Sequence, residues 1–267
     1  MKKLVYSLML VALLVFAGCE KEWRLLPDVT DTTDTTDEPY TEPSGDGLFS
    51  VSEGKQVRFA SGNLEYDSIN GYYFAAHQYD YGGYFCWGTG SNPTLTSSDY
   101  HYYPTFDDWG NHIAGGWRTL TGAEWDYVTW YRTHASAKRG AATVCGVPGM
   151  VLLPDNFSGG TFTAGFDFYD FDYHSEGWSR NVYDASSWSE MEDAGAVFLP
   201  AAGHCFGIDY DMVVEAVGTG GCYWSSTPFL VDEAYAMCFD EHHVHNADCP
   251  LRFDGLSVRL VQEYHGN

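Results

Sequence analysis

Residues 48–267 are predicted to form a single α+β domain. Only two segments of this part carry the signals of a helix start, whereas many short segments alternate apolar and polar residues as strands do. Glycine, proline, asparagine and aspartate separate these segments, and the stretches between them are rich in aromatic residues. Few helices among many short strands, with long loops, is the pattern of an α+β fold.

The first helix is predicted to begin at Thr121, because Glu124 follows three residues later. This spacing is that of a capping box, in which each side chain accepts a hydrogen bond from a backbone N–H that the helix start leaves unpaired. Trp125 and Val128 then lie on the same face of the helix and are expected to be buried.

The second helix is predicted to begin near Ser187, with Glu190 in the matching position of a capping box. Gly195 is the kind of residue that ends a helix. The expected apolar side of this helix comprises Trp188, Met191 and Ala194.

Strand signals recur along the whole domain. Strands are predicted at 56–60, 72–75, 150–153, 197–199, 222–226, 234–239 and 257–261. If the fifth and sixth of these form a hairpin centred on Leu230, Cys222 and Cys238 lie directly opposite each other, and a disulfide between them is one of two open readings. Six small buried cysteines with no disulfide are the alternative, and the sequence leaves both open.

Residues 1–18 are predicted to be a lipoprotein signal peptide. Lys2 and Lys3 precede an apolar stretch that is too short to span a membrane. The residues Phe-Ala-Gly-Cys at 16–19 resemble the lipobox of bacterial lipoproteins, which implies cleavage before Cys19 and lipidation of its thiol. We therefore expect an anchor in outer-membrane lipid through Cys19. The alternative is an ordinary signal peptide followed by an unmodified cysteine.

Residues 19–47 are predicted to be the lipidated cysteine and an acidic, disordered tether. The segment is rich in acidic residues and proline and repeats Asp-Thr-Thr, so it cannot bury enough apolar surface to offset its chain entropy. Glu-Lys-Glu at 20–22 resembles signals that direct lipoproteins to the outer face of the cell, so surface exposure is expected. The net charge of −24 excludes a nucleic-acid partner, because a phosphate backbone requires a basic surface.

The aromatic-rich stretches 79–87, 100–109 and 166–173 are predicted to be loops. Aromatic rings stack on sugars, and neighbouring carboxylates accept hydrogen bonds from hydroxyl groups or bind calcium. The candidate ligand-binding residues are Tyr102, Tyr103, Asp167, Tyr169, Asp170 and Asp172. Packing of these aromatic residues on the core, with the aspartates in solvent, is the alternative.

The segment 241–249 has the composition of a metal site. On a strand, His243 and His245 share one face, and Asp248 or Cys249 could complete the ligands of a zinc ion. The spacing matches no standard metal motif, so no cofactor is predicted from a motif, although calcium or zinc remains open. A solvated histidine-rich loop is the alternative reading.

Ordered motifs along the domain resemble a known family. They include Leu-Phe-Ser-Val-Ser at 48–52, Gly-Trp-Arg-Thr-Leu-Thr at 116–121, Gly-Ala-Val-Phe-Leu-Pro-Ala-Ala-Gly at 195–203 and Tyr-Trp-Ser-Ser at 223–226. Together they resemble the surface-protein family called the Fibrobacter succinogenes major paralogous domain, over essentially all of 48–267. Residues 117–128 are also similar to a block of the formylglycine-generating sulfatase-modifying enzymes. Both resemblances imply a C-type-lectin-like fold with two helices, small twisted antiparallel sheets and long functional loops.

The function expected from these features is that of a non-enzymatic surface lipoprotein. Its domain would bind a glycan or protein ligand and serve in adhesion. The paired reactive cysteines of the formylglycine-generating enzymes are missing, as are standard hydrolase motifs and the calcium-binding triplets of C-type lectins. A metal-dependent enzyme on the same scaffold and a structural subunit of a surface assembly are the alternatives.

Overall fold

The computed structural model describes residues 47–91, 105–166, 176–208 and 211–266. The chain divides into two units, Met1–Thr41 and Glu42–Asn267, and every described residue belongs to the second. The predicted signal peptide, Cys19 and all of the predicted tether except Gly47 lie outside the described residues. Within the described ranges, none of the helices has the length and apolar character that crossing a membrane demands.

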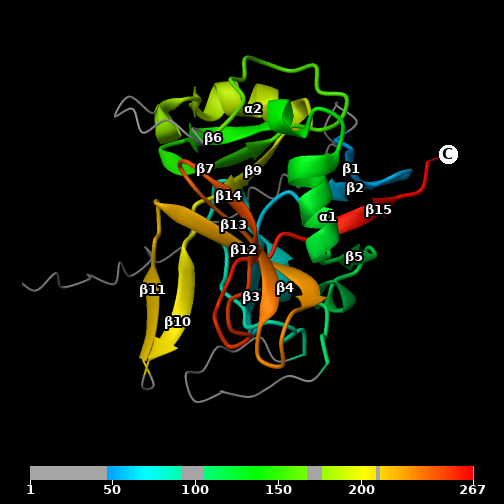
Figure 1. The fold of residues 1–267 in the computed structure, drawn as a ribbon, viewed down its shortest axis with the longest axis vertical. Helices are drawn as coiled ribbons and strands as arrows, with labels where there is room; N and C mark the ends of the chain where they lie inside the picture. The colour runs from blue at the N-terminus through cyan, green and yellow to red at the C-terminus, as the bar shows by residue number, and fades with distance from the viewer. Residues whose placement is uncertain (1–46, 92–104, 167–175, 209–210, 267) are drawn as a thin grey trace, which may run out of the picture. The chain divides into compact units, whose positions relative to one another are not determined.

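The described part of the chain has the predicted α+β architecture, with two α-helices among small sheets (Figure 1). One four-stranded antiparallel sheet joins the beginning of the folded part to its end. In sheet order its strands are β1 (Phe49–Ser52), β2 (Lys55–Phe59), β15 (Val261–Tyr264) and β5 (Trp117–Arg118).

A second four-stranded sheet packs against helix α2 (Ala185–Asp193), and Figure 1 shows the helix beside it. In sheet order its strands are β8 (Val182–Tyr183), β6 (Arg139–Val144), β7 (Val147–Leu152) and β9 (Val197–Pro200). The pairing of β6 with β8 is parallel and the other two are antiparallel. Trp188 and Met191 of α2 form one apolar cluster with Val151 and Phe198 of the sheet.

Three smaller units complete the fold. Two are hairpins, one made of β3 (Leu64–Asp67) and β4 (Gly71–Phe74), the other of β10 (His204–Ile208) and β11 (Asp211–Glu215). The third is an antiparallel sheet in the order β12 (Gly220–Pro228), β13 (Ala234–Asp240) and β14 (Val244–Asp248). Short 3-10 helices occur at Trp109–His112, Ala135–Lys138 and Gly177–Ser179.

The predicted start of the first helix is confirmed. Helix α1 (Gly122–Asp126) has Thr121 as its N-cap, and a π-helical turn (Tyr127–Tyr131) continues it. The Thr121 Oγ1 accepts a hydrogen bond from the Glu124 N–H at 3.2 Å, and Glu124 Oε2 accepts one from the Thr121 N–H at 2.8 Å. Trp125, on the expected face, is fully buried.

The predicted start of the second helix is wrong by several residues. Its N-cap is Asp184, whose Oδ1 accepts a hydrogen bond from the Ser187 N–H at 2.8 Å. The Ser187 hydroxyl accepts one in return from the Asp184 N–H at 2.9 Å, so Ser187 fills the position expected of Glu190. The predicted end is right, because Gly195 has a positive φ of 85° immediately beyond the helix.

The strand predicted at 257–261 begins only at Val261. Ser257 to Leu260 are almost completely buried, and in place of one ladder they make one bridge, from Ser257 to Tyr223, and isolated backbone hydrogen bonds to several neighbours. Arg259 is also buried here, and its guanidinium donates to the backbone carbonyls of Ala60 and Phe198. The segment is therefore buried on all sides without being a strand, and its sequence pattern resembles that of a buried strand.

Candidate metal centre

The three-stranded sheet β12–β13–β14 packs one apolar cluster on each face, and Cys238 belongs to a different cluster from Phe239 and Val244. Cys238 pairs with His245 and Phe239 pairs with Val244, so side chains alternate between the faces along both strands. Phe239 and Val244 are buried in the large apolar cluster that also contains Trp125 of α1. Asp240 follows Cys238 by two residues and therefore continues the opposite face.

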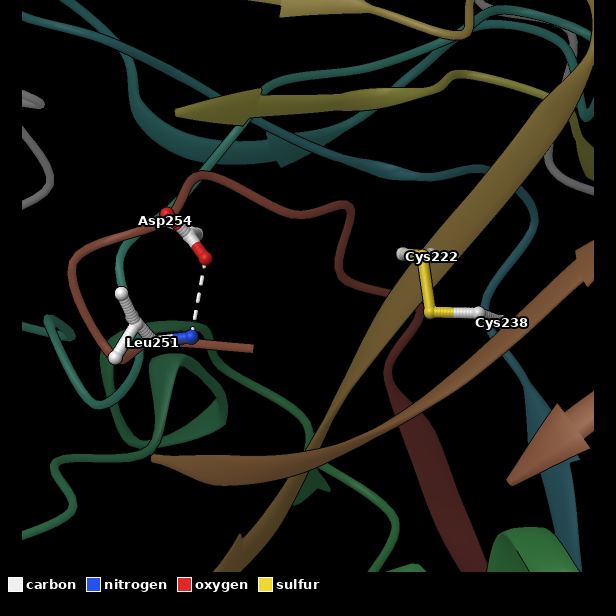
Figure 2. The surroundings of a disulfide bond; sticks show 4 residues. All are labelled: Cys222, Cys238, Leu251 and Asp254. Atoms are coloured by element: carbon white, nitrogen blue, oxygen red, sulfur yellow. Dashed lines mark hydrogen bonds between the residues drawn. A yellow bond between two sulfur atoms is a disulfide. The ribbon is translucent and has the colours of Figure 1, made fainter. Parts of the chain in front are cut away.

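Cys222 and Cys238 lie opposite each other on β12 and β13, and a disulfide joins them (Figure 2). This is the pairing expected from a hairpin centred on Leu230. The disulfide links the central strand of the sheet to β12, two residues before β13 ends at Asp240.

Figure 2 also shows a turn in which Asp254 accepts a hydrogen bond from the Leu251 N–H at 3.0 Å. Burial raises the pKa of Asp254 above its ordinary value.

Three potential metal ligands converge beside the disulfide, at the end of the sheet where β13 turns into β14. One ligand atom from each of Asp240, His243 and His245 lies within 4.8 Å of the other two. The turn is held by Asp240 itself, whose Oδ1 accepts hydrogen bonds of 2.7 Å from the backbone N–H groups of His242 and His243. The rings of His243 and His245 have their centroids 5.4 Å apart. The structure therefore gathers two imidazoles and one carboxylate on a short, self-bonded turn.

This donor set fits a transition metal ion. Imidazole nitrogen suits zinc, copper, nickel and iron, whereas calcium and magnesium prefer oxygen donors alone. Donors bound to one zinc at about 2.0–2.2 Å lie at most about 4.4 Å apart, so small side-chain rotations would bring all three to bonding distance. The carboxylate of Asp240, at 3.3 Å from His243 Nδ1, is close enough to shift from this contact to the metal. His243 and Asp240 are partly exposed, so a ligand could reach the site from solvent.

The structure brings together two of the three predicted metal ligands. His243 and His245 belong to the group, but Asp248 does not, and neither does the alternative ligand Cys249. Asp248 pairs with Ala236 near the far end of β14, and three residues of extended chain separate it from His245 by about 10 Å. The prediction of Asp248 is therefore wrong, and Asp240 takes its place.

Asp240 could have been found from the sequence by pairing β13 with β14. The strand ending at Asp240 and the strand beginning at Val244 are joined by only three residues, so Asp240 faces His243 across the turn. Asp240 precedes the histidines in sequence, on the strand before the turn, and the predicted ligands all lie in or after the turn.

The other candidate ligand-binding residues belong to two segments of the chain. Residues 92–104 and 167–175 lie outside the described part of the chain. They contain Tyr102, Tyr103, Asp167, Tyr169, Asp170 and Asp172. The predicted loop at 79–87 is described and has no regular strand, and Phe85 makes a single bridge to Leu256.

A cluster of buried charges, unforeseen in the sequence, lies elsewhere in the domain. Arg132, Lys138 and Arg139 are three of the nine basic residues in 48–267, and they occur within eight residues. The side chain of Arg132 is fully buried and donates to Asp155 Oδ1 at 3.3 Å. Burial and the charge of Arg132 lower the pKa of Arg139 to about 10, and the Arg139 guanidinium stacks 3.7 Å from the centre of the Trp130 ring. These contacts connect the π-helical turn that follows α1 to β6 and to the loop that contains Asp155, which is a structural role.

The comparisons with known proteins give no information on the candidate metal centre. No protein-family model, curated protein or solved structure significantly matches this chain.

Proposed function

We propose that this chain is a lipid-anchored surface protein whose C-type-lectin-like domain binds a transition metal ion and, through it, a glycan or protein ligand. The observation that carries the proposal is the convergence of Asp240, His243 and His245 on one turn. Zinc is the metal that we expect, because two imidazoles and a carboxylate are donors that it prefers.

Three protein ligands leave a tetrahedral zinc ion one position for an outside donor. Sites that bind or activate external molecules have this open arrangement, whereas purely structural zinc sites have four protein ligands. A sugar hydroxyl or carboxylate, or a side chain of a protein partner, could occupy the open position. Metal-bridged capture of this kind requires no reaction, which agrees with the binding and adhesion role expected from the resemblance to surface proteins.

The position of the turn supports a binding role. Asp240 and His243 retain about two fifths of their side-chain exposure, and the adjoining pair of Glu241 and His242 is also partly exposed, with their charged atoms 3.2 Å apart. The opposite face of the same strands packs into the core through Phe239 and Val244. The ligand atoms therefore stand on a rigid support while remaining accessible.

Titration of the purified full chain with zinc tests the proposal. We expect one zinc ion per chain by calorimetry, with at least a tenfold loss of affinity in His243→Ala and in His245→Ala. Asp248→Ala and His265→Ala are matched controls, since they remove a carboxylate and an imidazole outside the group, and their affinity should equal that of the wild type. The metal site is refuted by the absence of stoichiometric zinc, or by an Asp248→Ala loss as large as that of His245→Ala.

The anchor is tested separately through Cys19. We expect the wild-type chain to incorporate labelled palmitate and to fractionate with the outer membrane, and Cys19→Ser to do neither. Protease added to whole cells should remove the wild-type domain if it is displayed outside. A wild-type chain that carries no lipid would contradict the proposed anchor but would leave the metal site untouched.

A further inference from the structure

The metal-binding turn and the disulfide occupy the same face of one sheet. Cys238 on β13 pairs directly with His245 on β14, and directly opposed residues of an antiparallel pair project to the same side with Cβ atoms about 4.5–5.5 Å apart. Asp240, two residues after Cys238, projects to that side as well. Cys238 is therefore a further donor residue, buried and directly opposite His245, and its sulfur is held in the disulfide to Cys222.

We propose that reduction of the Cys222–Cys238 disulfide makes Cys238 a fourth protein ligand and closes the metal site. The proposal rests on the proposed metal binding by Asp240, His243 and His245. A dithiol supplies the two electrons and two protons: its own sulfurs become a disulfide, the bond between Cys222 and Cys238 breaks, and two thiols form. When the metal then binds Cys238, the thiol proton passes to solvent.

The register decides which of the two sulfurs joins the metal. Cys238 is on the central strand, one strand away from His245, whereas Cys222 is on β12, two strands away. Adjacent strands are about 4.7–4.9 Å apart, so roughly twice that distance separates Cys222 from His245. A zinc–sulfur bond of about 2.3 Å and a zinc–nitrogen bond of about 2.0–2.1 Å span the shorter separation but not the longer one.

Closure would change what the site does. In the oxidised protein the metal has three protein ligands and an open position for an external donor. In the reduced protein two imidazoles, one carboxylate and one thiolate complete a tetrahedral shell, which holds zinc more tightly and excludes the outside ligand. External ligands would therefore be captured only by the disulfide-bonded form, which is the form favoured in an exported protein.

Cobalt(II) absorption tests the inference, because a cobalt–thiolate bond produces a charge-transfer band in the near ultraviolet that nitrogen and oxygen ligands do not produce. The full chain would be reduced with dithiothreitol, freed of reductant without oxygen, and titrated with cobalt beside an unreduced sample. We expect cobalt binding in both samples, the charge-transfer band only after reduction, and at least a tenfold rise in zinc affinity on reduction.

Two serine variants show which of the two sulfurs binds the metal. They also test the inference if reduction of the wild type disturbs the fold. Cys222→Ser leaves Cys238 as a permanent thiol, so it should show the band with no reductant. Cys238→Ser should bind cobalt without the band in either condition. The inference is overturned if the reduced wild type binds cobalt without a band, or if Cys238→Ser keeps the band. Failure of the unreduced protein to bind cobalt at all would instead refute the underlying metal site.

Discussion

Replacing Asp155 with asparagine is expected to lower the free energy of unfolding by about 3 kcal/mol, the lower end of the range for removing one partner of a buried ion pair. Arg132 has no exposed side-chain surface, so it cannot turn to water when its counter-charge is lost. Asp155 Oδ2 also accepts hydrogen bonds from the Ser50 N–H, the Ser50 hydroxyl and the Gln56 amide at 2.7–2.9 Å. Asparagine keeps an acceptor oxygen for some of these bonds, which is why the upper end of the range is not expected.

Urea unfolding of the full chain at neutral pH measures this loss, and thermal unfolding should show a fall in Tm of about 6–12 °C for a domain of this size. Asp232→Asn is the matched control, because Asp232 is exposed and a surface change of this kind alters stability by about 0.5 kcal/mol or less. Equal stability of Asp155→Asn and Asp232→Asn would refute the argument that the buried guanidinium depends on this carboxylate.

The same pair of proteins gives a pH test of the electrostatic cause. Burial raises the pKa of Asp155, but hydrogen bonds from Ser50 and Gln56 and the charge of Arg132 outweigh it, so the pKa lies below the ordinary value of 3.8. Because the folded pKa is lower than the unfolded one, the carboxylate stabilises the fold fully above the unfolded value, and this stability is lost as pH falls through the folded pKa. The advantage of the wild type should be constant from neutral pH to about pH 5 and should shrink in more acidic solution. An advantage that grows on acidification would contradict this account.

The remaining predictions concern two glycines with positive φ and the N-cap of α2, and both are measured by the same urea unfolding. Gly203 and Gly54 both have φ near +70°, but a Cβ at Gly203 would collide with the carbonyl oxygen of Glu215, whereas one at Gly54 would meet open space. Alanine should therefore cost about 1–2 kcal/mol at Gly54 and about 1–3 kcal/mol more at Gly203, and equal costs would count against the collision. Asp184→Ala should cost about 1 kcal/mol by removing the N-cap of α2, while Ser186→Ala, at the second residue of that helix, should be nearly neutral.

The helix starts show how far local sequence determines local structure. Thr121 and Glu124 satisfy each other's backbone N–H groups, so the sequence pattern and the structure agree. Ser187 and Glu190 have the same spacing, but Asp184 and Ser187 form an overlapping pair with the same geometry. The chain uses the earlier pair, which adds a turn to α2. The spacing of capping residues therefore restricts the start of a helix to one of two adjacent turns, but it does not show which of the two the chain uses.

The hairpins show a different limit. The pairing of Cys222 with Cys238 could be predicted because the two residues lie at equal distances in sequence from Leu230, the centre of the expected turn. The pairing of β13 with β14 contains an irregularity: two residues on β13, from Ala236 to Cys238, match three on β14, from His245 to Asp248. An irregularity of this kind has no sequence signature. It places Asp248 opposite Ala236, on the same face as Cys238 and His245, so it is the distance of about 10 Å along the strand that separates Asp248 from the group.

The position of the disulfide explains how so short a turn could form a defined metal site. A hairpin turn that is held only by its own hydrogen bonds loses conformational entropy when a metal orders it, and that loss weakens binding. Here the core fixes one face of β13 and β14 through Phe239 and Val244, and the disulfide fixes β13 from the other face at Cys238. Asp240 lies two residues after Cys238, and His245 lies opposite Cys238. His243 lies in the turn itself, so the geometry of the candidate site and the redox dependence proposed for it have one structural origin, the disulfide beside the turn.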